Sequence, residues 1–128
     1  MQKKILLADD EPHMALMIKS LLPDYKLIKA ITGDEAIEKA KTEQPDLIML
    51  DIMMPENQNS AHRIIPGQGI TVCKKLKEME NTKNIPVIML SVIASAKEKE
   101  AINAGAKKCF NKLYDDAEML KWVEQLLG

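Results

Sequence analysis

The chain has 128 residues, of which 46% are hydrophobic and 29% charged, and 18 basic side chains nearly balance 19 acidic ones. This length predicts a single domain over residues 1–128 with a substantial core. The balanced charge argues against direct binding of nucleic acid. Since no apolar run approaches a membrane span or a signal-peptide core, we expect a cytoplasmic protein whose partner is a small molecule or another protein.

Short apolar segments alternate with helix-like segments along the whole chain. Such alternation predicts an α/β protein with a doubly wound parallel sheet. Several of the segments are rich in Ile, Leu and Val, as strands buried on both faces usually are. The predicted strands lie near residues 3–8, 26–31, 46–51, 85–91 and 108–111.

The predicted helices lie between these strands. The first follows Pro12, which a first helical turn tolerates, and its apolar stripe comprises Met14, Met17, Ile18, Leu21 and Leu22. The second opens at Thr32 or Asp34, and the third covers roughly residues 69–80. Capping-box spacing predicts the starts of the last two helices, at Ser95 with Glu98 and at Asp115 with Glu118.

Two of the apolar strands run directly into acidic residues. Asp9 and Asp10 follow the first strand, and Asp51 ends the third. The carboxyl ends of parallel strands meet at one edge of a sheet, where ligands bind. Three carboxylates there would repel one another by about 4 kcal/mol per close pair at an effective dielectric of ~20, so they predict a bound cation. Few carboxylates combined with water and phosphate oxygens suit Mg²⁺.

Two further polar side chains end strands at the same predicted edge. Ser91 ends the fourth strand, and Lys112 follows the fifth. An aspartate can attack a phosphoryl group as a nucleophile, while a hydroxyl and an ammonium bind the transferred oxygens. The set therefore predicts phosphoryl chemistry that depends on Mg²⁺.

Four motifs converge on this edge: Asp9-Asp10-Glu11-Pro12, Asp51-Ile52-Met53-Met54-Pro55, Pro86-Val87-Ile88-Met89-Leu90-Ser91, and Gly105-Ala106 with Lys112. Together they resemble the motifs of the receiver domain of two-component response regulators. The resemblance covers essentially the whole chain, and the order and spacing of the motifs make it specific. It implies a flavodoxin-like five-stranded parallel sheet in the order 2-1-3-4-5 with five helices.

The resemblance also implies a role for each site residue. Asp51 would accept the phosphoryl group, with Ser91 and Lys112 binding the aspartyl phosphate. The implied Mg²⁺ ligands are Asp10, Asp51 and the backbone carbonyl of Met53, with Asp9 assisting through water. The donor would be a sensor histidine kinase or a histidine phosphotransfer protein, and the output would pass to a downstream protein through the fourth helix, fifth strand and fifth helix. The only reactions catalysed would be the domain's own phosphorylation and dephosphorylation.

Four features depart from the usual receiver pattern. Leu113 stands in place of a proline, Cys109 in place of an aromatic residue and Val92 in place of an alanine, and residues 56–68 form an inserted loop. An alternative is therefore a phosphorylation-independent receiver that acts as a protein-binding module. A haloacid-dehalogenase-type phosphatase also uses a strand-end aspartate, but it requires a second acid where this chain has Met53.

Overall fold

The computed structural model describes residues 2–9, 11–57, 59, 67–92, 94–112 and 116–127, without the side chains of His13, Ala94, Ser95 and Asp116. Over these residues the chain forms one parallel sheet in the order β2-β1-β3-β4-β5. The strands are β1 (Lys4–Ala8), β2 (Lys26–Ala30), β3 (Leu47–Asp51), β4 (Val87–Ser91) and β5 (Lys108–Asn111). The helices are α1 (Pro12–Leu21), α2 (Gly33–Glu43), α3 (Gln68–Glu78), α4 (Ala94–Asn103) and α5 (Asp116–Leu127).

The order of the strands explains their composition. Every residue of the inner strands β3 and β4 is buried, so both are continuous apolar runs until their last residue, and the third inner strand, β1, is buried after Lys4. The edge strand β2 instead exposes Lys26 and Lys29 and buries Ile28 and Ala30. Lysines on an edge strand discourage pairing with another chain. The predicted fold class and strand order are confirmed, with strand limits that differ by two residues or fewer.

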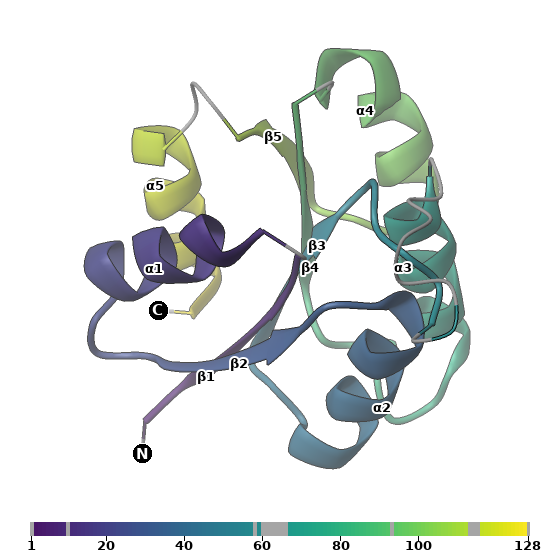
Figure 1. Cartoon of the computed structure of the whole chain (residues 1–128), viewed down its shortest axis with the longest axis horizontal. Helices are drawn as coiled ribbons and strands as arrows, with labels where there is room; N and C mark the ends of the chain where they lie inside the picture. Colours follow the sequence, from purple (N-terminus) through teal and green to yellow (C-terminus); the bar gives the residue numbers. More distant parts are fainter. Residues whose placement is uncertain are drawn as a thin grey trace.

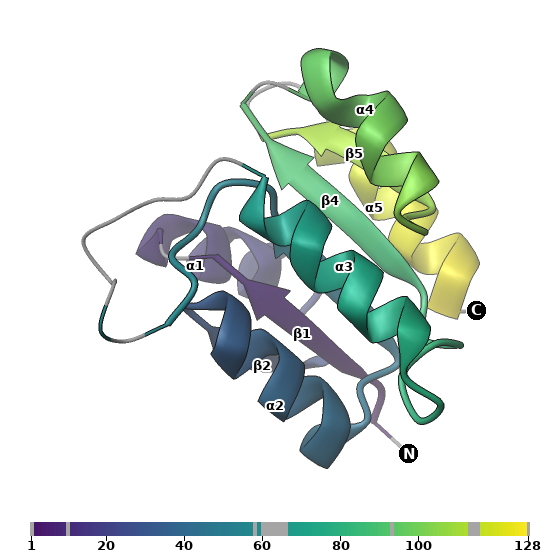
Figure 2. The same cartoon turned by 90° about the vertical axis from the view of Figure 1, so that its right-hand side faces the viewer.

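The helices cover both faces of the sheet (Figure 1). Helices α1 and α5 lie on one face, and Figure 2 shows α2, α3 and α4 side by side on the other. Most of the stripe predicted for α1 is buried, including Met14, Ile18 and Leu22, but Leu21 is 36% exposed. Of the two leucines at the end of the predicted stripe, Leu22 is buried and Leu21 is the more exposed.

Local hydrogen bonds explain where the helices begin. Thr32 caps α2, since its hydroxyl oxygen accepts from the Glu35 N–H at 3.1 Å. The capping-box spacing predicted that Ser95 precedes α4. The helix begins at Ala94, so Ser95 lies inside its first turn. Asp115, the predicted cap of α5, lies outside the described residues.

The start of α3 packs directly against the end of β3. The N–H of Gly69 donates to the carbonyl of Ile52 at 2.9 Å. A Cβ at Gly69 would lie 2.1 Å from the carbonyl oxygen of Asp51, so only glycine permits this approach. The contact determines the position of Asp51 relative to the helix layer.

The segment after β3 also contacts α2. The N–H groups of Gly33 and Asp34 donate to the carbonyls of Pro55 and Glu56, each at 2.8 Å, and satisfy two amides at the start of α2. Most of the predicted inserted loop lies outside the described residues, which omit 58 and 60–66. Within the described part of the chain, no helix combines the length and apolar character that crossing a membrane requires.

Candidate functional site

Parallel pairing brings the predicted site residues to one edge of the sheet. Asp9 follows β1, whose last residue Ala8 pairs with Leu50 of β3. Asp51 ends β3 next to β4, and Ser91 ends β4 opposite Asn111. Lys112 directly follows β5. Strand pairing therefore determines this convergence, as the sequence predicted.

The ammonium group of Lys112 lies among three carboxylates. Its Nζ is 2.8 Å from Asp9 Oδ2, 2.9 Å from Asp51 Oδ2 and 3.5 Å from Glu11 Oε1. The Lys112 side chain is only 5% exposed, and those of Asp9 and Asp51 are 0% and 7% exposed. Charges this well buried are stable only when they are paired.

Each of the two buried aspartates has one oxygen occupied by a backbone amide. Asp51 Oδ1 accepts from the N–H of Met53 at 3.0 Å, and Asp9 Oδ1 accepts from the N–H of Glu11 at 2.9 Å. The other oxygen of each faces Lys112. Asp9 Oδ2 is buried and has no hydrogen bond within the described residues, so its 2.8 Å contact with Lys112 is an ion pair.

Burial and crowding shift the pKa values of this group. Burial, reinforced by the nearby charge of Asp9, raises the pKa of Asp51 to about 6, although Lys112 and the Met53 N–H act in the opposite direction. Burial alone would lower the pKa of Lys112, but its contacts with Asp9 and Asp51 outweigh burial and raise it. Lys112 therefore stays charged, while Asp51 ionises at a higher pH than an exposed aspartate.

The described residues fit a hard divalent cation. Asp9 Oδ2 is a buried carboxylate oxygen without a hydrogen bond, and Asp51 lies across the same ammonium group. Asp10, predicted as a direct ligand, lies outside the described residues, and those described contain no group of three metal-ligating side chains. The oxygen donors that are present are of the type Mg²⁺ prefers.

The structure describes Ser91 and two of the residues that depart from the receiver pattern, Cys109 and Val92. The Ser91 side chain is buried at the end of β4, and Cys109 is buried on β5. Val92 is 52% exposed, so at least half of its surface faces solvent rather than the site. Leu113 lies outside the described residues.

Sequence reasoning assigned no role to Glu11, which the structure places against Lys112. Its position within the Asp9-Asp10-Glu11 run was the available signal.

A doubly wound sheet with an acidic carboxyl edge and a buried lysine is typical of phosphoryl-accepting receivers. The sequence matches the response regulator receiver domain family over residues 5–124, and the chain belongs to this family. This confirms the resemblance that the motifs predicted and disfavours the phosphatase alternative. Receiver domains of this family are phosphorylated by histidine kinases.

Two relatives illustrate the range of the family. The chain is 34% identical over 127 residues to RpaA of Synechocystis, a DNA-binding transcriptional regulator, and the match covers 97% of this chain and 48% of RpaA. The chain thus spans about half the length of that relative. It is 32% identical over 132 residues to the chemotaxis protein CheY of Bacillus subtilis, with 100% of both chains covered.

Solved structures show the same fold. A response regulator from Chloroflexus aurantiacus superposes with a TM-score of 0.83 at 24% identity, covering 99% of this chain and 98% of that one. The receiver domain of the sensor histidine kinase PA1611 from Pseudomonas aeruginosa, described with magnesium coordinated in its active-site cleft, has a TM-score of 0.80 at 21% identity, covering 100% and 99%. At these identities the likeness concerns the fold.

Proposed function

We propose that Asp51 is the residue of this receiver that accepts a phosphoryl group, from a sensor histidine kinase or a histidine phosphotransfer protein. The observation that carries the proposal is the 2.9 Å contact between the buried Asp51 carboxylate and Lys112, beside Asp9 at the carboxyl edge of the sheet. A nucleophile and a cation for the transferred oxygens are thus adjacent.

The chemistry follows from the surroundings of Asp51. With a pKa of about 6, the carboxylate is mostly ionised at neutral pH and can attack phosphorus. The new bond joins a carboxylate oxygen to phosphorus, and the bond between phosphorus and the donor nitrogen breaks. Lys112 keeps its proton and can pair with a phosphoryl oxygen. Ser91, buried at the end of the neighbouring strand, is the proposed hydroxyl partner of the aspartyl phosphate.

Mg²⁺ is the proposed cofactor, held by Asp10, Asp51 and the backbone carbonyl of Met53, with Asp9 assisting through water. When bound, it would neutralise charge on the carboxylates and the incoming phosphoryl group. The two buried carboxylates of Asp9 and Asp51, which share one ammonium group, support this, as does the magnesium described in the PA1611 receiver.

We further propose that residues 1–128 act as one receiver domain, with 56–68 as an inserted loop near the site. The output is a change in the surface offered to a downstream protein. The phosphorylation-independent alternative is not favoured, because Asp51 and Asp9 both contact Lys112 and the chain belongs to the receiver family.

The test is incubation with acetyl phosphate and Mg²⁺ followed by intact-mass measurement. We expect the wild type to gain one phosphoryl group and Asp51→Asn to gain none. Chelation of Mg²⁺ should suppress the gain in the wild type. Equal labelling of Asp51→Asn, or no labelling of the wild type, would contradict the proposal.

A further inference from the structure

Glu11 contributes the third carboxylate around Lys112. An ammonium group has three N–H donors, and the three carboxylates of Asp9, Asp51 and Glu11 surround it at 2.8, 2.9 and 3.5 Å. Asp9 and Asp51 belong to the proposed phosphoryl and metal site. Glu11 has no role in that site, although it faces the same cation.

Lys112 contacts two carboxylates that also belong to the proposed Mg²⁺ site, those of Asp9 and Asp51. Asp9 Oδ1 and Asp51 Oδ1 already accept backbone N–H groups, so Oδ2 of each carboxylate is the one that faces the lysine. A divalent cation bound at Asp51, with Asp9 assisting through water, would lie close to the ammonium group that contacts both carboxylates. Two cations so close repel each other, and Lys112 then needs another acceptor.

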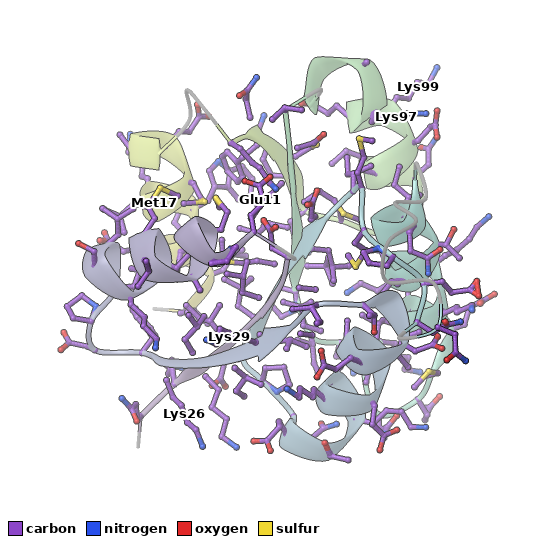
Figure 3. The ribbon with its side chains drawn as sticks, in the orientation of Figure 1. Glu11, Met17, Lys26, Lys29, Lys97 and Lys99 are labelled. Atoms are coloured by element: carbon purple, nitrogen blue, oxygen red, sulfur yellow. The ribbon has the colours of Figure 1, made fainter. Side chains whose placement is uncertain are left out.

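Glu11 is built to be that acceptor. Its backbone N–H donates to Asp9 Oδ1 at 2.9 Å, which holds the residue beside the site, and Pro12 begins α1 immediately after it. Its side chain is 47% exposed, whereas those of Asp9 and Asp51 are buried. Figure 3 shows Glu11 beside the start of α1, on the side toward β5. Its carboxylate therefore lies at the solvent side of the lysine.

We propose that Glu11 is a positioning residue that holds the Lys112 ammonium at the solvent side of the site while Mg²⁺ is bound at the Asp51 carboxylate beside Asp9. The inference rests on the proposed function. Glu11 would thus strengthen Mg²⁺ binding by acting on Lys112, and the effect would depend on the length of the Glu11 side chain.

The test is the dissociation constant of Mg²⁺, measured by titration calorimetry on the intact chain. Glu11→Gln removes the acceptor charge, so Lys112 stays on Asp9 and Asp51 and Mg²⁺ binds at least about threefold more weakly, a coupling expected of groups in contact. In a Lys112→Met background the same substitution should change affinity by less than about twofold. Equal weakening in both backgrounds would show a general charge effect and overturn the inference.

A second variant serves if Lys112→Met does not fold. Glu11→Asp keeps the charge but shortens the side chain by one methylene, so it should weaken Mg²⁺ binding as Glu11→Gln does. If Glu11→Asp binds Mg²⁺ as tightly as the wild type, the length of the Glu11 side chain has no effect and the inference is overturned. The matched control is Glu80→Gln, which removes a glutamate from an ion pair with Lys83 at 3.0 Å on the surface and should leave Mg²⁺ affinity unchanged.

The proposed function and the role of Glu11 can be tested separately. If the wild type neither binds Mg²⁺ nor accepts a phosphoryl group, the proposed function and the inference both fall. If the wild type does both and Glu11→Gln matches it in Mg²⁺ affinity, only the role of Glu11 is overturned.

Discussion

Two lysines differ in what surrounds the amine: Lys112 lies where the parallel strands end, at the carboxyl edge of the sheet, and the partly buried Lys77 lies where they begin, at its amino edge. Lys112, at the carboxyl edge, contacts three carboxylates. Lys77, on α3, donates to the backbone carbonyls of Lys83 at 3.1 Å and Ile85 at 2.6 Å, in the segment that leads into β4. One ammonium is held by charges and the other by neutral dipoles.

The two environments shift the lysine pKa in opposite directions. Burial lowers the pKa of Lys77, and the nearby charge of Lys107 adds to the effect. For Lys112 the carboxylates overcome burial, and the pKa is raised. At the amino edge, Lys77 therefore holds the segment between α3 and β4 through hydrogen bonds to backbone carbonyls. The carboxyl edge concentrates charges that repel unless a cation is present, which is the property a phosphoryl site needs.

Removing the charge at the carboxyl edge should have the largest effect. Lys112→Met leaves Asp9 and Asp51 buried without their cation, so we expect a loss of about 3–5 kcal/mol in unfolding free energy at pH 8 without metal. Urea denaturation measures it. The loss should shrink at pH 5, where Asp51 is largely protonated. A loss under about 1 kcal/mol at pH 8 would show that the buried carboxylates at the carboxyl edge do not need the charge of Lys112.

Neutralising the acceptor should stabilise the protein. The pKa of Asp51 is raised from 3.8 to about 6, so between these values the native state binds more protons than the unfolded state, and stability falls as pH rises. Asp51→Asn removes this cost. We expect a gain of about 1–3 kcal/mol at pH 8 in chelator and almost none at pH 4. A gain that is independent of pH would show that burial of the charge is not its cause.

The corresponding change at the amino edge, Lys77→Met, should be smaller and should not depend on metal. Lys77→Met removes two hydrogen bonds to carbonyls and should cost about 2 kcal/mol in unfolding free energy. Since the pKa of Lys77 is lowered, the wild type should gain stability as pH rises toward the ordinary lysine value, and the variant should lack that gain. Mg²⁺ should not alter the difference. A loss that depends on Mg²⁺ would show that Lys77 is coupled to the metal site, contrary to this prediction.

The smallest effect should come from a neutral group at the amino edge. The Thr82 hydroxyl is fully buried and donates to the carbonyl of Leu76 at 2.7 Å. Thr82→Val keeps the shape and loses this hydrogen bond, so we expect a cost of about 1 kcal/mol. The carbonyl of Leu76 keeps the N–H of Met79 at 3.4 Å, which limits the cost. Thermal denaturation at pH 5 and pH 8 should give the same difference.

Local pattern was sufficient to predict the layers and the position of the site. Apolar runs that end on Asp51 and Ser91 predict strands, and parallel pairing makes their ends neighbours whatever the details of packing. The sequence placed the start of α2 at Thr32 or Asp34, of which Thr32 is the cap, but missed the start of α4 by two residues, because the register of a helix end depends on its neighbours.

The sequence by itself determined the sheet, its order through the family motifs, and the meeting of Asp9, Asp51 and Lys112 at one edge. Tertiary structure alone decided that Glu11 reaches Lys112 from the far end of the chain, and that burial raises the pKa of Asp51. The physical reason is that strand ends follow from backbone pairing, which is periodic and readable along the chain. Side-chain reach and desolvation depend on what packs around each group in three dimensions.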